Sequence, residues 1–147
     1  RFEALLENLK RALALGTATI SAASLTATAG DVAIDAGTIE IKNGGSVVQG
    51  SSKSTTVVLN TEAGKITMHA AALASDTAVT FTVTNSTARA TDVCIVNHHS
   101  GGTVGAYAID ATGHAGGSFK ITLRNITSGA LSEALVLHYA LIKTAHT

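Results

Sequence analysis

Aromatic residues make up only 3% of this sequence of 147 residues, tryptophan is absent, and there is a single cysteine. One cysteine cannot form an internal disulfide, which excludes the disulfide framework of a small secreted domain. Charged residues account for 14% of the chain and cancel to a net charge of zero, so the sequence lacks the positive surface that nucleic-acid binding needs. No apolar run is long enough to span a bilayer, and a net charge near zero favours association over a solitary monomer.

The chain opens with a helical pattern. Four apolar residues, spaced four, three and four positions apart, form its seam: Phe2, Leu6, Leu9 and Leu13. This spacing is the heptad of a coiled coil, and Leu5, Ala12 and Leu15 widen the apolar face, which suits three helices better than two. Gly16 then ends the helix. We therefore predict a coiled-coil stem over residues 1–16, which we expect to continue upstream of Arg1; an amphipathic helix lying on the chain's own core is the alternative.

Small residues dominate the next segment, residues 17–50. Apolar and polar residues alternate over Val32–Ile34 and Ile39–Ile41, which predicts short strands, and Gly44–Gly45 is typical of a turn between strands. Such thin strands bury too little surface to be stable alone, but three chains wrapped together could bury them against one another. We predict a slender β-rich transition here, with a loosely ordered linker as the alternative.

The remainder, residues 51–147, has the pattern of an all-β domain. Its strands are separated by turn-forming pairs such as Gly101–Gly102 and Gly116–Gly117. The predicted strands are Thr55–Leu59, Lys65–His69, Ala78–Thr84, Asp92–Asn97, Thr103–Ile109, Ser118–Arg124 and Ala134–Lys143. Seven short strands in so few residues predict a mainly β fold, a β-sandwich or jelly roll.

The last predicted strand is apolar on both of its faces. Leu135, Leu137, Tyr139 and Leu141 share one face, and Val136, His138, Ala140 and Ile142 share the other. A two-layer sandwich covers only one face of a strand, so we expect a neighbouring subunit to cover the second face. Together with the wide helical seam, this interface strand indicates a symmetric homotrimer made of a stem, a transition and a compact β head.

The sequence contains no arrangement of residues that indicates an enzyme. Neither a Gly-x-Ser-x-Gly motif nor a phosphate-binding loop is present, and Cys94 lies in an apolar run, where a buried, inert thiol is expected. Adjacent residues on an extended chain point to opposite faces, so His98–His99 cannot readily bind one metal ion, and we predict a solvated loop there. Asn85 and Asn125 match the glycosylation pattern, which we take as chance. We predict no catalytic, cofactor or metal site.

One weak binding hypothesis remains. Arg89, Lys120 and Arg124 are basic residues of the head with hydroxyl groups around them. If two chains bring such groups together at a subunit seam, a small carboxylate or other anion could bind there. The alternative is that these charges only keep the head soluble.

Three stretches of the head carry a resemblance to a known family: KSTTVVLN (Lys53–Asn60), TAVTFTVTN (Thr77–Asn85) and GGSFKITLRNITSGALSEALVLHYALIK (Gly116–Lys143). With the heptad stem before them, they resemble the carboxy-terminal domains of phage tail needles and tail fibres, especially the knobbed needles of short-tailed temperate phages. This resemblance implies a trimeric jelly-roll knob, similar to tumour-necrosis-factor-like heads, on a coiled coil that plugs the portal channel. It implies no active-site residues.

These observations favour a structural function. The first hypothesis is a trimeric knob in the virion that stabilises the needle, joins the upstream needle and the phage tail, and contacts the host envelope during genome delivery. The alternative is the receptor- or glycan-binding head of a phage fibre or trimeric adhesin. The head offers few aromatic platforms for a sugar, because Phe81, Phe119 and Tyr139 are predicted to point inward, which leaves Tyr107.

The stem gives a first test. The substitution Leu9→Asp places a charge on each helix at the seam, so three unpaired charges would meet there, and we expect assembly to be disrupted. The mass of the particle in solution and its melting temperature measure this effect. A variant that keeps the native mass and melting behaviour would show that Leu9 is not on a seam.

Overall fold

The computed structural model describes residues 2–4, 40 and 44–144. The chain divides into two units, residues 1–38 and residues 39–147. In the first unit, residues 2–4 are helical and the side chain of Phe2 is 78% exposed. The other predicted seam residues, Leu6, Leu9 and Leu13, and the short strands predicted between residues 32 and 41 lie outside the described residues.

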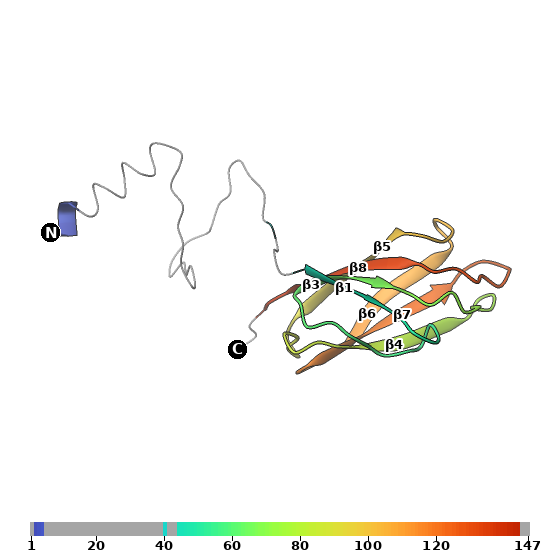
Figure 1. The fold of residues 1–147 in the computed structure, drawn as a ribbon, viewed down its shortest axis with the longest axis horizontal. Coiled ribbons are helices and arrows are strands. Elements are labelled where there is room, and N and C mark those ends of the chain that lie inside the picture. Colours follow the sequence, from blue (N-terminus) through green and yellow to red (C-terminus); the bar gives the residue numbers. More distant parts are fainter. Residues whose placement is uncertain (1, 5–39, 41–43, 145–147) are drawn as a thin grey trace. The chain divides into compact units, whose positions relative to one another are not determined.

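Eight strands in the second unit form two four-stranded sheets (Figure 1). Sheet 1 has the order β1-β3-β8-β5, with β1 (Gly44–Val48), β3 (Ala63–Thr67), β8 (Val136–Ile142) and β5 (Val93–Ser100). Sheet 2 has the order β2-β4-β7-β6, with β2 (Val57–Val58), β4 (Ala78–Thr84), β7 (Ser118–Asn125) and β6 (Tyr107–Ala115). The pairs β1–β3 and β2–β4, each at one edge of its sheet, are parallel. The other four strand pairs of the two sheets are antiparallel. The predicted mainly β fold is confirmed as two layers of strands.

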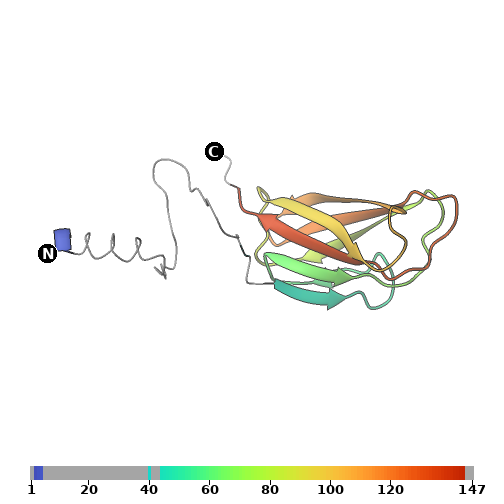
Figure 2. The same ribbon diagram turned by 90° about the horizontal axis from the view of Figure 1, so that it is seen from above.

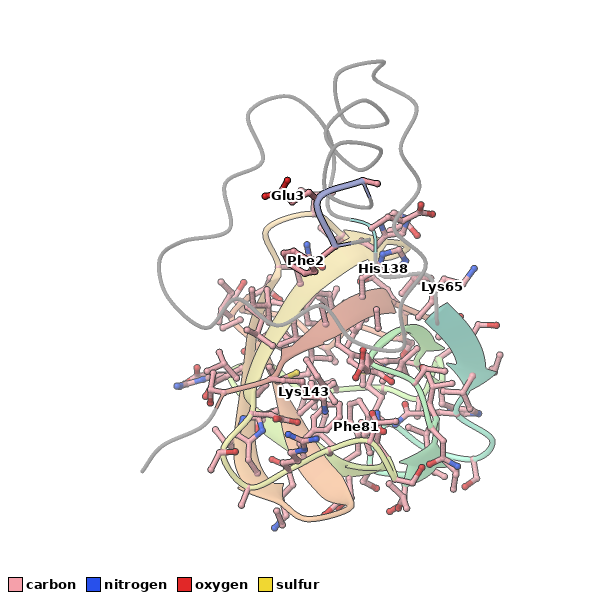
Figure 3. All side chains as sticks on the ribbon, turned by 90° about the vertical axis from the view of Figure 1, so that its left-hand side faces the viewer. Phe2, Glu3, Lys65, Phe81, His138 and Lys143 are labelled. Carbon is pink, nitrogen blue, oxygen red and sulfur yellow. The ribbon has the colours of Figure 1, made fainter. Side chains whose placement is uncertain are left out.

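The apolar core lies between the two sheets. Inward-facing residues alternate with outward-facing ones because successive side chains of a strand point to opposite sides. In β8 the predicted inner face is confirmed: Leu137, Tyr139 and Leu141 are all buried. The ring of Tyr139 meets the ring of Phe119 from β7 edge-on, with 5.2 Å between their centres. Figure 3 shows Phe81 of β4 between the two layers, where it is likewise buried.

Two glycines allow the layers to approach closely at the start of sheet 1. Gly45 and Gly64 are paired across β1 and β3, and Gly64 is paired with Tyr139 of β8. A methyl group on Gly64 would lie 2.5 Å from Leu59 and 2.7 Å from the ring of Tyr139, and one on Gly45 would lie 2.8 Å from Leu59. The expectation of a turn at Gly44–Gly45 is therefore wrong, since both residues lie within β1. The sheet begins upstream of the head boundary that the sequence placed at residue 51.

Strand β6 differs from its predicted position. The sequence predicted a strand over Thr103–Ile109, whereas β6 begins at Tyr107 and continues to Ala115. Three glycines with positive φ, Gly101, Gly102 and Gly105, turn the chain before β6. The carboxylate of Glu133 accepts hydrogen bonds from the backbone N–H and the hydroxyl of Thr103, which holds that residue in the loop. The polar run after Ile109 then extends β6 because it pairs with β7.

An asparagine closes the sandwich just after β4. The side chain of Asn85 is fully buried. Its Oδ1 accepts hydrogen bonds from the backbone N–H and the hydroxyl of Thr87, at 2.9 and 2.8 Å. Its Nδ2 donates to the carbonyl of Thr61 at 2.7 Å and to the hydroxyl of Tyr139 at 3.2 Å. This side chain therefore ties the end of sheet 2 to the segment that enters sheet 1.

The same arrangement closes the opposite end of the sandwich, at the last residue of β7. Asn125 is fully buried, and its Oδ1 accepts hydrogen bonds from the backbone N–H and the hydroxyl of Thr127. Its Nδ2 donates to the carbonyls of Leu73, Ala74 and Gly129. Asn85 and Asn125 lie at opposite ends because β4 and β7 are antiparallel. The two matches to the glycosylation pattern are therefore structural turns with a buried asparagine, in which the threonine of each motif bonds to its asparagine.

Both asparagines are predicted to be required for stability. Replacing Asn85 or Asn125 by alanine leaves buried backbone groups without partners, so we expect each variant to lose about 2–4 kcal/mol of unfolding free energy. Denaturant unfolding monitored by circular dichroism measures the loss. Asn60→Ala is the control, because the Oδ1 of Asn60 makes an exposed hydrogen bond to the N–H of Ser86. Equal losses in all three variants would contradict the role given to the buried pair.

Candidate functional site

The outward side of sheet 1 is the candidate site. We call this surface the sheet 1 outer face, and Figure 2 shows its four strands side by side. It consists of the outward residues Gly44, Ser46, Val48, Ala63, Lys65, Thr67, Val93, Ile95, Asn97, His99, Val136, His138, Ala140 and Ile142. Lys65 carries the only permanent charge among them. Among the residues that the structure describes, this sheet surface is nearly uncharged, and most of its large side chains are exposed or half-buried.

Apolar side chains gather on this face over β5 and β8. The strand pairing places Val93 beside Ile142 and Ile95 beside Ala140. Val93, Ile95 and Ile142 are 48%, 54% and 47% exposed in the single chain. Large apolar side chains that gather on one surface mark a contact site, whereas scattered ones do not.

The outward side of sheet 2 has a different chemistry. The hydroxyls of Thr80 and Thr122 are hydrogen-bonded to each other at 2.8 Å. Arg124 forms an ion pair with Asp76, with 2.6 Å between Nη2 and Oδ1. Lys120 lies on the same side of β7 and is exposed. These outward residues of sheet 2 are polar or charged, as is usual for a sheet with one face in water. The outer faces of the two sheets therefore differ in chemistry.

Two stacked histidines lie on the sheet 1 outer face. The rings of His99 from β5 and His138 from β8 are nearly parallel, at 8°, with 3.7 Å between their centres. Lys65 of β3 is the strand partner of His138 on its other side, and Figure 3 labels Lys65 and His138 on their neighbouring strands. The Nε2 atom of His138 is buried and has no hydrogen-bond partner within the described chain. Burial, the charge of His99 and the charge of Lys65 all lower the pKa of His138.

A shallow hollow of about 570 Å³ lies beside this pair. It is lined by Lys65, His99 and His138 and by small residues of β1 and β3, among them Gly44 and Ala63. The glycine and alanine residues of this lining have little or no side chain to fill the hollow. The hollow could receive a protruding side chain.

The structure places the four residues of the predicted interface strand together on this face. Val136, His138, Ala140 and Ile142 all point outward from β8, opposite the buried residues of the same strand. Sequence reasoning missed the contributions of the neighbouring strands, above all Lys65, Val93 and Ile95. The alternation in residues 92–97 was visible in the sequence, but only the strand order shows that β5 lies beside β8.

The histidine pair predicted on a solvated loop lies in strand β5 instead. The side chain of His98 is half-buried, and its Nε2 lies 3.1 Å from the carbonyl oxygen of Ser100. His99 points to the other side of the strand and meets His138. The prediction that neighbouring histidines face opposite ways holds, and the loop prediction failed because pairing with β8 extends β5 to Ser100.

The three basic residues considered for an anion site are not brought together within one chain. Arg89 lies in the loop after β4, where its backbone N–H bonds to Asp92. Lys120 and Arg124 share the outward side of β7, but four residues of a strand separate them by about 13 Å. The guanidinium of Arg124 is already paired with Asp76. The single chain therefore offers no converging site for a carboxylate at these three positions.

The structure also bears on the cysteine, on metal-binding groups and on membrane-spanning helices. Cys94 is half-buried, and burial raises the pKa of its thiol to about 12, so the thiolate is rare at neutral pH. In the described part of the chain, no group of three or more histidine, cysteine or carboxylate side chains is arranged to hold a metal ion. Within those same residues no helix is both long and apolar enough to cross a membrane.

Comparison of the chain with models of protein families, with curated proteins and with solved structures finds no significant match. The interpretation of the sheet 1 outer face therefore rests on its own geometry and chemistry.

Proposed function

We propose that this chain is the trimeric knob at the tip of a viral tail needle or tail fibre, and that the sheet 1 outer face is the surface through which three copies meet. The observation that carries the proposal is the two-sided strand β8. Its inner residues are buried in the core between the two sheets. Its outer residues lie beside the exposed Val93 and Ile95 on a nearly uncharged face. Covering this face with a second copy would bury apolar surface, and each Å² of apolar surface removed from water stabilises the assembly by about 25 cal/mol.

The strand order supports a jelly roll. From β3 to β6 the chain alternates between sheet 1 and sheet 2, and β8 returns to the middle of sheet 1 between β3 and β5. Crossing from one sheet to the other at each step is typical of jelly-roll heads. In this proposal β6 and β7 form the one hairpin within a sheet, joined by the turn at Gly116–Gly117.

The positions of the strand ends and loops support a terminal head. β1 begins and β8 ends at the same end, because Gly44 and Ala140 both lie beside Ala63. The loops 68–77, 101–106 and 126–135 lie at the other end. A stem that enters beside β1 would leave these loops at the free end, where a knob would meet a host envelope.

The free end shows few unpaired charges in the structure. The amine of Lys53 is buried and donates to the carbonyls of His69 and Glu133, at 2.6 and 2.5 Å, and burial lowers its pKa. The carboxylate of Glu133 accepts hydrogen bonds from Thr103 and from the hydroxyl of Tyr107. What remains exposed is mostly small and neutral, a surface suited to contact rather than to chemistry.

A second candidate function is a glycan- or receptor-binding head. The observation in its favour is a hollow of about 350 Å³ at the free end, lined by Tyr107, His98 and glycines of the 101–106 loop. However, Tyr107 is half-buried and its hydroxyl is engaged with Glu133 at 2.7 Å. The ring is therefore less open than the platforms on which sugars usually stack, and we favour the structural knob.

The mass of the particle in solution tests the proposal. Light scattering over a dilution series is expected to give three times the chain mass of 14.8 kDa. In the variant Ile95→Asp, assembly would bury a charge from each copy without a partner, so we expect the dissociation constant to rise by at least about tenfold. Thr82→Asp, on the outward side of β4, is the matched control and should remain trimeric.

Each result has a separate meaning. A wild-type chain that stays at 14.8 kDa at every concentration would overturn the trimer. If Ile95→Asp weakens the trimer no more than Thr82→Asp does, the chains assemble through the stem. The sheet 1 outer face would then not be the surface through which the copies meet.

A further inference from the structure

The stacked histidines occupy a face to which the four strands of sheet 1 contribute no acidic side chain. Each strand of sheet 1 contributes to the surroundings of His138: Ser46 from β1, Lys65 from β3, and Asn97 and His99 from β5. On β8 itself the neighbours on this side are Val136 and Ala140. None of the four strands places an aspartate or glutamate on the sheet 1 outer face. A proton that binds to either imidazole therefore adds positive charge beside Lys65 without compensation.

We infer that the stacked His99–His138 pair makes self-association through the sheet 1 outer face sensitive to acid, so that the assembled head is tight at neutral pH and loosens as the imidazoles become protonated. This inference rests on the proposed function, because it needs a second copy to cover the face. It adds a regulatory property that trimer formation alone does not require.

The direction follows from proton linkage. Histidine has an ordinary pKa of about 6.5, and the surroundings of His138 already lower its pKa in the single chain. Covering the face excludes more water from the pair, which disfavours the charged forms further. The assembled state then binds fewer protons than the separated chains. Association is therefore at full strength above about pH 6.5, and it weakens as the pH falls through the lowered pKa that His138 has in the separated chains.

Stacking adds to this effect. Two neutral imidazoles at 3.7 Å form a favourable contact, whereas two imidazolium rings at that distance repel each other. The unpartnered Nε2 of His138 shows that no described group within the chain stabilises a proton at that atom.

The test measures the dissociation constant of the full chain by sedimentation equilibrium at pH 8 and pH 5, at constant ionic strength. For the wild type we expect the constant to be at least about tenfold larger at pH 5, the factor for one proton whose pKa is shifted by one unit. The double variant His99→Gln, His138→Gln should lose this response. His98→Gln is the matched control, because His98 is on the same strand but the opposite face, and it should keep the wild-type response.

A third variant keeps the inference falsifiable if the double variant does not fold. Lys65 is exposed, and Lys65→Gln removes the fixed charge beside His138, so we expect a smaller pH response than in the wild type. Equal dissociation constants for the wild-type trimer at both pH values would overturn this inference and leave the proposed trimer intact. An unchanged response in the double variant, or in Lys65→Gln, would also overturn it. A wild-type monomer at pH 8 would overturn the proposed function and this inference together.

Discussion

Strand β8, which carries apolar residues on both of its faces, is the element on which the rest of the structure depends. One face is buried by sheet 2, where Leu137, Tyr139 and Leu141 pack around Phe119. Sheet 1 is arranged so that β8 lies between β3 and β5, which satisfies its backbone groups on both sides. Nothing within the described chain covers the other face, and the exposed apolar residues of β5 extend it. The second copy that we propose follows from this one unsatisfied surface.

Polar groups in the interior serve mainly to hold the loops. Asn85 and Asn125 make the same turn at opposite ends of the sandwich, and the amine of Lys53 caps carbonyls at the loop end. At the other end Lys143 bonds to Asp92 at 2.7 Å. Burial is the largest single influence on Asp92 and opposes its ionisation, but the hydrogen bonds from Lys143 and from the backbone N–H of Arg89, together with the charges of both residues, keep the pKa of the carboxyl below its ordinary value. A chain with so few charges thus uses several of them inside the fold, where they fix loops rather than bind ligands.

The small number of charged residues connects the fold to the proposed function. A head that assembles through a flat, nearly neutral face needs no steering charge, and a neutral free end can approach another surface without electrostatic selection. The histidine pair is the exception on the sheet 1 outer face, since its charge depends on pH while that of Lys65 does not. Because the four strands of sheet 1 place no acidic side chain beside the pair, the assembly has its proposed response to acid.

The sequence by itself determined the class of the fold and the inner and outer sides of its regular strands. The alternation in β4, β7 and β8 was readable because side chains on a strand repeat every two residues, and β8 stood out because both of its faces are apolar. Tertiary structure alone decided the rest. Gly44 and Gly45 lie in a strand because they pair with Ala63 and Gly64 of β3. β6 begins late because Glu133 holds Thr103, and the buried Asn85 was indistinguishable from a surface motif. His99 meets His138 only because β5 pairs with β8, and no local pattern in the sequence encodes the pairing of strands so far apart along the chain.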